Sequence, residues 1–293
     1  MHIEFFRSKR LLFMTNSKTQ ILMSTSAVLL IFVIEIVLLG FRKSSVANLL
    51  RNERSSHRDV LSYLLDVTGA LRLMGHAVTL GSGYLIGQFI QQRLHLNLTG
   101  LLAQPAVQFS AFLFAKSFFD YWMHRLMHTF PVLWEIHKYH HSAAEMNVVT
   151  AHRESILVAP WSSLYFAIPL GIIGTPTSTV WLVGFLIEVH AVLVHSQLIV
   201  SWGKLGEYFL ISPLAHRVHH SLDEKHWGKN YGFIFSFWDH VFGTYHLDEV
   251  RKPIVIGVRD VVYNHASWPH EMLYCLHSFA LQVRNLIPFK RTV

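Results

Sequence analysis

Long apolar runs separated by short charged connectors make up the first half of the chain. Residues 21–40 carry a single charge, Glu35, and about twenty apolar residues are enough for a helix to cross a hydrocarbon core of roughly 30 Å. Further apolar runs cover residues 61–90 and 105–119. The pattern therefore predicts helices that lie in or cross a membrane.

Two more apolar runs, residues 156–173 and 177–194, are divided by the turn-forming sequence Gly-Thr-Pro. We expect them to form a helical hairpin that enters or crosses the membrane and returns. Such a hairpin brings the polar segments before and after it to the same side. Residues 202–245 are polar but rich in aromatic side chains, and residues 250–293 alternate basic and apolar positions without a predicted element.

These runs predict an all-α fold, an integral membrane bundle of about four or five membrane helices. We expect one domain over residues 1–293, with N-terminal membrane helices in 1–104 and a C-terminal tail in 248–293. The connector 42–59 is rich in arginine and lysine, and positive connectors favour the cytoplasm. That orientation places the end of the 105–119 run in the cytoplasm, although the basic residues 1–19 then lie on the other side.

The composition supports a membrane protein. Hydrophobic residues make up 52% of the 293 residues and charged residues 15%, with a mean hydropathy of +0.33, whereas soluble domains carry about a quarter charged residues. The net charge of +7 is scattered between apolar runs, which suits anionic lipid better than nucleic acid. The single cysteine, Cys275, excludes a disulfide framework, a thiolate zinc site and an iron–sulfur cluster built by this chain.

Histidine is the candidate metal ligand, and it is clustered. The chain has 21 histidines, and the spacing HxxHH occurs twice. The clustered residues are His124, His128, His137, His140, His141, His216, His219 and His220, with His190 and His195 at the end of the expected hairpin. Histidines three or four apart lie on one face of a helix. Asp120, one turn before His124, could accept the remaining ring N–H of a ligand.

The number of histidines favours two metal ions. A structural zinc site needs about four ligands and a catalytic one about three. Eight to ten clustered imidazoles are therefore more than one zinc ion can bind. Imidazole also serves iron, copper and nickel, so spacing alone leaves the element open. A zinc protease would need HExxH, but the sequence here is HRLMH. A metal transporter would place its histidines in the middle of membrane helices rather than at their ends.

Three motifs resemble the histidine boxes of the fatty acid hydroxylase/sterol desaturase superfamily. They are HRLMH at 124–128, HKYHH at 137–141 and HRVHH at 216–220. Asp120, His195-Ser196, Ser212-Pro213, Asn230-Tyr231-Gly232 and the segment WDHVFGTY at 238–245 are similar to further family motifs. The resemblance covers roughly residues 105–247, which are therefore the expected catalytic region.

The resemblance implies a membrane-bound di-iron oxygenase that hydroxylates a lipid C–H bond with dioxygen. The lipid is a sterol, fatty acyl chain, sphingolipid or carotenoid. Electrons come from a separate protein, a b-type cytochrome or a ferredoxin-like protein with a reductase. The alternatives are a lipid desaturase of the same family and a non-enzymatic metal-binding or transport protein. The expected location is the endoplasmic reticulum in a eukaryote or the inner membrane in a bacterium, with the site facing the cytoplasm.

The resemblance also assigns residues. The implied catalytic metal ligands are His124, His128, His137, His140, His141, His195, His216, His219 and His220, with His190 as a further candidate. Asp120 and Asp239 are expected to support them from outside, Asp239 by organising the turn after the third box. Arg153 or Glu154 could pair with a ligand, and Tyr231, Trp227 and Phe242 are expected membrane-interface aromatics.

Overall fold

The computed structural model describes residues 17–247 and 254–286, except 52, 80–81, 83–84, 87–88, 90–92, 94–101, 103 and 174–175. The expected all-α class is confirmed, because every regular element among these residues is a helix, apart from two isolated β-bridges. The expected basic N-terminus and the connector at 91–104 lie almost wholly outside the described residues. The elements are α2 (Ser17–Leu39), η1 (Phe41–Lys43), α3 (Ser45–Leu50), α4 (Arg54–Val67), α5 (Ala70–Val78), α7 (Pro105–Thr129), α8 (Pro131–His141), η3 (Val148–His152), α9 (Val158–Ile173), α10 (Thr177–Val194), α11 (Gly203–Tyr208), α12 (Pro213–His219), η4 (Glu224–His226), α13 (Phe237–Val241) and α14 (Trp268–Leu286).

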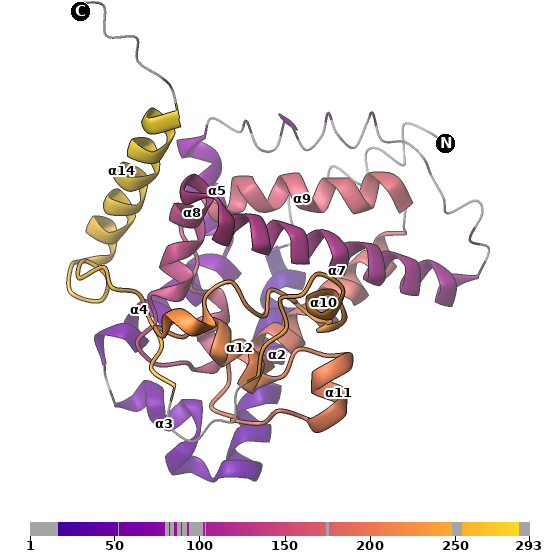
Figure 1. Ribbon diagram of the computed structural model, residues 1–293, viewed down its shortest axis with the longest axis horizontal. Coiled ribbons are helices and arrows are strands. Elements are labelled where there is room, and N and C mark those ends of the chain that lie inside the picture. The colour runs from indigo at the N-terminus through magenta and orange to yellow at the C-terminus, as the bar shows by residue number, and fades with distance from the viewer. Residues whose placement is uncertain are drawn as a thin grey trace, which may run out of the picture.

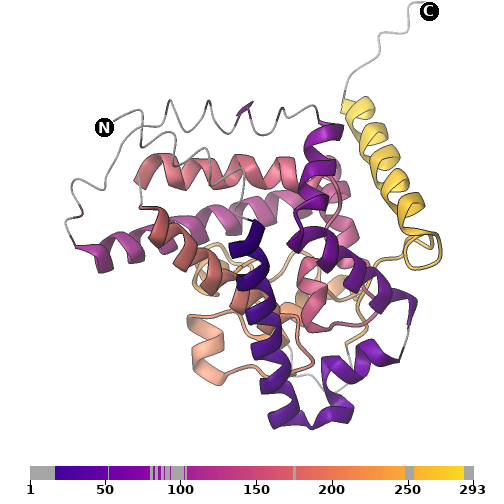
Figure 2. The same cartoon turned by 180° about the vertical axis from the view of Figure 1, so that it is seen from behind.

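Helices α7 and α9 form a layer along one side of the molecule, where they lie next to each other in both views (Figures 1 and 2). Beneath this layer α2 packs along α10, and the short helix α12 lies in the middle of the molecule (Figure 1). The apolar side chains of α2, η3 and α10 form one core, and those of α7, α9 and α10 form another. These two cores hold α10 against both the N-terminal helix and α7.

Two prolines shape the segment that carries five of the candidate histidine ligands. Pro105 begins α7 and Pro131 begins α8, positions where the missing N–H of proline costs no helical hydrogen bond. Phe130, the residue before Pro131, is extended (φ −100°, ψ 123°), as expected for a residue that precedes proline. The chain therefore turns sharply at Phe130, and α8 folds back against the end of α7.

Both helices expected for the hairpin are present as α9 and α10, but α9 packs mainly on α5 and α7 and α10 on α2, and the chain then returns to the histidine segment through α12. Ser212 caps α12, because its hydroxyl accepts a hydrogen bond from the Ala215 N–H (3.1 Å), and Pro213 occupies the first turn. His195 follows α10 directly as its C-cap residue. The hairpin thus delivers His195 and α12 to the same region as α7 and α8.

Two expectations need correction. The apolar run at 61–90 is not one element, because α4 ends before Gly69, which adopts a left-handed φ of 78°, and α5 begins after it. The C-terminal segment, for which no element is predicted, contains α14. This helix packs against α8, and its Cys275 thiol donates a hydrogen bond to the Glu135 carbonyl oxygen (3.1 Å).

Among the described residues, one helix segment is long and apolar enough to cross a membrane, Lys18–Leu39 in α2. Ser178–Val194 in α10 is a shorter apolar segment.

Candidate metal centre

Nine of the predicted histidines converge in the middle of the molecule and form two groups. The first group is His124, His128, His137, His141 and His219, and the second is His140, His195, His216 and His220. Within each group, one nitrogen from each ring lies within 4.8 Å of all the others. The histidines lie on four helices, α7, α8, α10 and α12, or on their C-cap residues.

The spacing between the ring nitrogens matches the spacing of ligands around one ion. Neighbouring Nε2 atoms are 3.1 Å apart for His140 and His195, 2.9 Å for His195 and His216, and 3.2 Å for His216 and His220. In the first group the Nε2 atom of His137 lies 3.1 Å from that of His124 and 3.2 Å from that of His141. Two imidazoles bound at right angles with metal–nitrogen bonds of about 2.1 Å are about 3.0 Å apart.

Each HxxHH motif is divided between the two groups. His137 and His141, one helical turn apart, belong to the first group, while His140 belongs to the second. In the other motif His216 and His220 belong to the second group and His219 to the first. Residues four apart lie on one face of a helix, and the residue between them points to the side. One short helix can therefore serve two adjacent sites, which explains why the same spacing occurs twice.

Backbone carbonyl groups orient three of the rings. Nδ1 of His124 donates to the Tyr231 carbonyl oxygen (2.8 Å), Nδ1 of His219 to that of Lys229 (2.8 Å), and Nδ1 of His195 to that of Ala191 (2.7 Å). A proton held on Nδ1 leaves the lone pair on Nε2, the nitrogen that points into the group.

The expectation that Asp120 accepts a ring N–H from a ligand is wrong. Tyr231 already accepts the proton of His124, and the carboxylate of Asp120 instead forms a buried ion pair with Lys116, one turn earlier on α7. The two charges of this pair neutralise each other within α7.

Asp239 supports the site through the backbone, as expected for a residue that organises the turn after the third motif. Its carboxylate accepts hydrogen bonds from the N–H groups of Tyr231 (2.7 Å) and Gly232 (2.8 Å) and from the Thr244 hydroxyl (2.7 Å). Burial raises the pKa of Asp239 to about 6, against the effect of these hydrogen bonds. Asp239 therefore fixes the peptide whose carbonyl group orients His124.

The Asn230-Tyr231-Gly232 motif has a steric explanation. Asn230 has a left-handed φ of 56°, and its amide donates to the carbonyl oxygen of Ala215 in α12 (2.9 Å). A Cβ atom on Gly232 would lie 2.4 Å from the Phe235 carbonyl oxygen and 2.7 Å from Asp239 Oδ2. Only glycine allows this approach, so the motif ties the Tyr231 carbonyl group to the helix that carries His216 and His219.

The histidine rings of α8 and α12 are uncharged, so their nitrogen lone pairs can bind a metal ion. Burial lowers the pKa of each of them well below its ordinary value, and the neighbouring rings lower it further. Neutral imidazole is the form that binds metal. Within the described part of the chain, Nε2 of His128 and Nε2 of His219 are buried without a hydrogen-bond partner. Such atoms are costly to bury, and a cation shared by the first group would satisfy both.

His190 lies outside both groups. Its Nε2–H donates a hydrogen bond to the Ile211 carbonyl oxygen (3.1 Å), which ties α10 to the segment before α12. The five-residue separation from His195 places the two rings on different faces of the helix.

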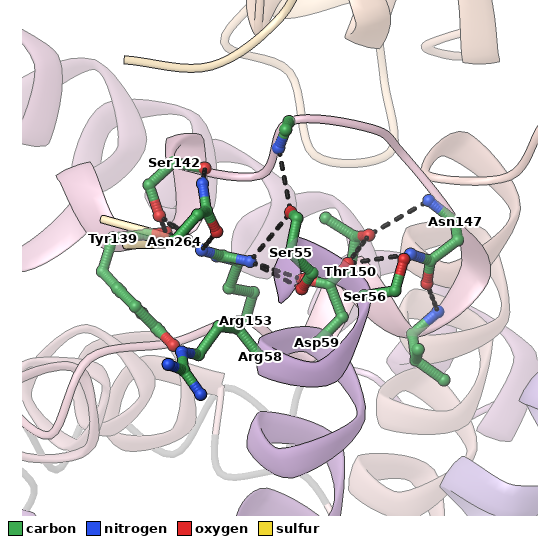
Figure 3. A network of polar contacts seen from close by, with 12 residues as sticks. Ser55, Ser56, Arg58, Asp59, Tyr139, Ser142, Asn147, Thr150, Arg153 and Asn264 are labelled. Carbon is green, nitrogen blue, oxygen red and sulfur yellow. Dashed lines mark hydrogen bonds and ion pairs between the residues drawn. The ribbon is translucent and has the colours of Figure 1, made fainter. Parts of the chain in front are cut away.

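Arg153 does not pair with a histidine but holds the end of the helix that carries three of them. Its side chain is fully buried and donates to Asp59 Oδ1 (2.9 Å), to the Tyr139 carbonyl oxygen (3.2 Å) and to the Ser142 hydroxyl (2.9 Å). Figure 3 shows this network spanning α4, the end of α8 and Asn264. Arg153 thus fixes the C-terminal turn of α8, where His140 and His141 lie.

In the described part of the chain, cavities border both histidine groups. A cavity of about 380 Å³ borders the first group at His128, His141 and His219 and is also lined by Trp134, Trp227 and Arg259. A smaller cavity of about 180 Å³ borders both groups and lies against η3, α9 and α10. A bound molecule in the smaller cavity would contact histidines of both groups.

Tyr231 is wrongly predicted to be a membrane-interface aromatic. Its side chain is 5% exposed, and its ring packs against the rings of His124, His128 and His219. Trp227, by contrast, is 53% exposed and lines the larger cavity. The sequence carries no direct signal for the carbonyl groups of Lys229 and Ala191, because any residue could supply them.

Comparison with known proteins gives one family and several relatives. Residues 109–244 match the family model "Fatty acid hydroxylase". The chain is 33% identical over 154 residues to the alkylglycerol monooxygenase of Homo sapiens, covering 53% of this chain and 33% of the relative. It is 30% identical over 138 residues to the ornithine lipid hydroxylase OlsE of Rhizobium tropici, covering 47% and 41%.

A third relative is the methylsterol monooxygenase erg25A of Aspergillus fumigatus, 29% identical over 162 residues, covering 50% of this chain and 49% of the relative. The chain thus spans between a third and a half of the length of these relatives. No solved structure matches the chain. All three histidine motifs fall within the matched residues, so residues 109–244 form a domain of the fatty acid hydroxylase family.

Proposed function

We propose that this protein is a membrane-bound di-iron oxygenase that hydroxylates a C–H bond of a lipid. The observation that carries the proposal is the convergence of nine imidazoles into two adjacent groups with ligand spacing. The activities of the relatives, an alkylglycerol monooxygenase and an ornithine lipid hydroxylase among them, support a lipid substrate and dioxygen as the oxidant. Electrons would come from a separate electron-transfer protein.

In this proposal each histidine group holds one iron ion. The first ion is bound by His124, His128, His137, His141 and His219, and the second by His140, His195, His216 and His220. Neutral imidazole suits iron, copper, nickel and zinc alike, and the oxygenase activities of the relatives favour iron. When bound, the two ions would supply the activation of dioxygen, which side chains alone cannot provide.

The chain's own residues have three tasks in this function. The carbonyl groups of Tyr231, Lys229 and Ala191 keep three imidazoles in one tautomer and orientation. Asp239 fixes the peptide whose carbonyl group orients His124, and Arg153 holds the turn of α8 that carries His140 and His141. Apolar side chains of α7, α9 and α10 line the smaller cavity, where they would exclude water and receive the lipid chain.

We place the protein in a membrane, with its site on the cytoplasmic side. The apolar side chains of α2 support this location, because Leu22, Val33, Val37 and Leu38 are more than half exposed. Large exposed apolar surfaces mark contacts with membranes or proteins. The apolar hairpin of α9 and α10 would be embedded beside α2. The expected locations remain the endoplasmic reticulum in a eukaryote and the inner membrane in a bacterium.

The proposal is tested by comparing lipids and bound metal in wild type and ligand variants. Cells that express the wild type should accumulate lipids with one added oxygen atom, and the purified protein should bind two iron ions per chain. His140→Ala and His219→Ala each remove a ligand from one group and should abolish the oxidised lipid. His270→Ala is the matched control, because His270 is exposed on α14. Undiminished lipid oxidation in both ligand variants would contradict the proposal, and a lipid with a new double bond would make the protein a desaturase instead.

A further inference from the structure

A second polar cluster lies beside the histidine groups and uses none of their residues. His152, at the end of η3, lies between two carboxylates: Nδ1 is 2.9 Å from Asp66 Oδ2, and Nε2 is 3.1 Å from Glu188 Oε1. Glu154 follows two residues later in the chain. We call these four residues the Glu154 cluster. They come from α4, η3, the segment after η3 and α10, so the cluster exists only in the folded chain.

The Glu154 cluster and both histidine groups line the same cavity of about 180 Å³. All four cluster residues border it, and so do His124 and His137 of the first group and His140, His195 and His216 of the second. The remaining lining is mostly apolar and comes mainly from α7, α9 and α10. A molecule in this cavity would therefore contact the cluster at one point and the proposed metal sites at another.

The cavity contains a hydrogen-bond acceptor and a donor without partners. Within the described part of the chain, Glu154 Oε2 and the indole Nε1 of Trp161 are both buried and make no hydrogen bond, and both residues line this cavity. Buried polar atoms without partners are rare in proteins and costly. Both would be satisfied by a ligand group that donates one hydrogen bond and accepts another, as a hydroxyl group does.

The charges of the Glu154 cluster make the binding of an anion unfavourable. Burial lowers the pKa of His152, but the carboxylates of Glu188 and Asp66 outweigh burial and raise it to about 10. The resulting imidazolium neutralises one of the two carboxylates. Burial also raises the pKa of Glu154 to about 8, with a further contribution from Asp66. Among the described residues, the cavity lining contains no lysine or arginine, so a phosphate or carboxylate in the cavity would meet negative charge without compensation.

We propose that Glu154 and Trp161 bind a hydroxyl group of the lipid and so place a neighbouring C–H bond against the two histidine groups. The placement of a C–H bond for oxidation rests on the proposed function, whereas the binding of a hydroxyl group by Glu154 and Trp161 does not. The substrate class is a lipid that carries a hydroxyl group close to the carbon that reacts. A lipid whose reactive carbon neighbours a phosphate or a free carboxylate does not fit.

The test is equilibrium binding of three radiolabelled probes with one chain length, hexadecanol, hexadecane and hexadecanoate. The full chain is purified in detergent and loaded with ferrous iron without dioxygen, so that binding is measured without reaction. Two hydrogen bonds, one with the Glu154 carboxyl group and one from the Trp161 indole, together change affinity by about tenfold. The wild type should therefore bind hexadecanol about tenfold more tightly than hexadecane, and hexadecanoate more weakly than hexadecanol.

The variants separate recognition from folding. Glu154→Leu should lower the affinity for hexadecanol to that for hexadecane without weakening hexadecane binding, and Trp161→Phe should remove part of the preference. Glu53→Gln is the control, because Glu53 is exposed and lies outside the cavity. Equal affinities of the wild type for hexadecanol and hexadecane would overturn the proposal. An equal loss of affinity for hexadecanol and hexadecane in Glu154→Leu would also overturn the proposal, because Glu154 would then have a structural role.

The two proposals fail in different ways. One outcome is that dioxygen and a reductant produce no oxidised lipid, while the preference for hexadecanol persists and depends on Glu154. This result would support the hydroxyl-binding site and contradict the proposed function. If the protein hydroxylates lipids and all three probes bind equally, the function stands and the hydroxyl site falls.

Discussion

The Nε2 atoms of His140 and His195 lie 3.1 Å apart, although 55 residues separate them in the chain. His140 is in the last turn of α8, and His195 is the C-cap of α10. Between η3 and His195 the chain runs through residues 153–157 and the hairpin of α9 and α10, so the packing of these helices decides whether the second histidine group forms. The first group contains no residue from the hairpin.

This arrangement predicts that the two metal sites can be lost separately. His195→Ala removes a ligand from the second group alone, so bound iron should fall from two ions per chain to about one. Lipid oxidation should be lost, because the proposed reaction needs both ions. The measurement is iron content by elemental analysis beside the yield of oxidised lipid. His190→Ala is the comparison, and a loss of iron there as large as in His195→Ala would show that His190 is a ligand.

Replacement of Asp239 should lower the affinity for iron, although Asp239 is not itself a metal ligand. Asp239→Asn turns one acceptor oxygen into an N–H donor that faces backbone N–H groups, so one of the hydrogen bonds to Tyr231 or Gly232 is lost. Outer partners of metal ligands change affinity by about 10–100-fold, and iron titration should show a loss in that range. Asp223→Asn, in an exposed cap where asparagine is equally good, should leave iron affinity unchanged. An unchanged affinity in Asp239→Asn would mean that Tyr231 does not orient His124.

Loss of Arg153 should destabilise the fold strongly. Arg153→Met leaves the fully buried carboxylate of Asp59 without its partner, and breaking a buried pair costs about 3–5 kcal/mol. Thermal unfolding in detergent should show a large decrease in the midpoint. The double variant Arg153→Met, Asp59→Leu removes both charges and should recover part of the loss. A double variant no more stable than Arg153→Met alone would show that the ion pair is not the source of the effect.

The stability of the protein should decrease between about pH 6.5 and 10 because of His152. Its folded pKa of about 10 exceeds the unfolded value of 6.5. The contribution is therefore complete below pH 6.5, where both states bind the proton, and disappears as the pH rises through 10. A shift of this size corresponds to a few kcal/mol. His152→Gln should flatten this part of the stability curve in urea unfolding followed by circular dichroism, and an unchanged slope would contradict the assignment.

The helical class and the candidate ligands could be predicted from the sequence because both depend on local spacing. The apolar runs at 21–40, 156–173 and 177–194 and the turn signal before 177 define elements within a few residues. HxxHH places its first and last histidines on one helix face. The nine ligands implied by the family resemblance all meet in the two groups, although spacing alone indicates only which histidines of one motif share a helix face.

The tertiary structure alone decided which histidine joins which group and what orients it. Asp120 is one turn from His124 in sequence, but the ring proton goes to Tyr231, 107 residues away, because backbone carbonyl groups carry no side-chain signal. Asp66, His152 and Glu188 meet only after α4 and α10 have packed against η3. Spacing along a helix determines which side chains can share a face, whereas contacts between distant segments depend on how whole helices pack.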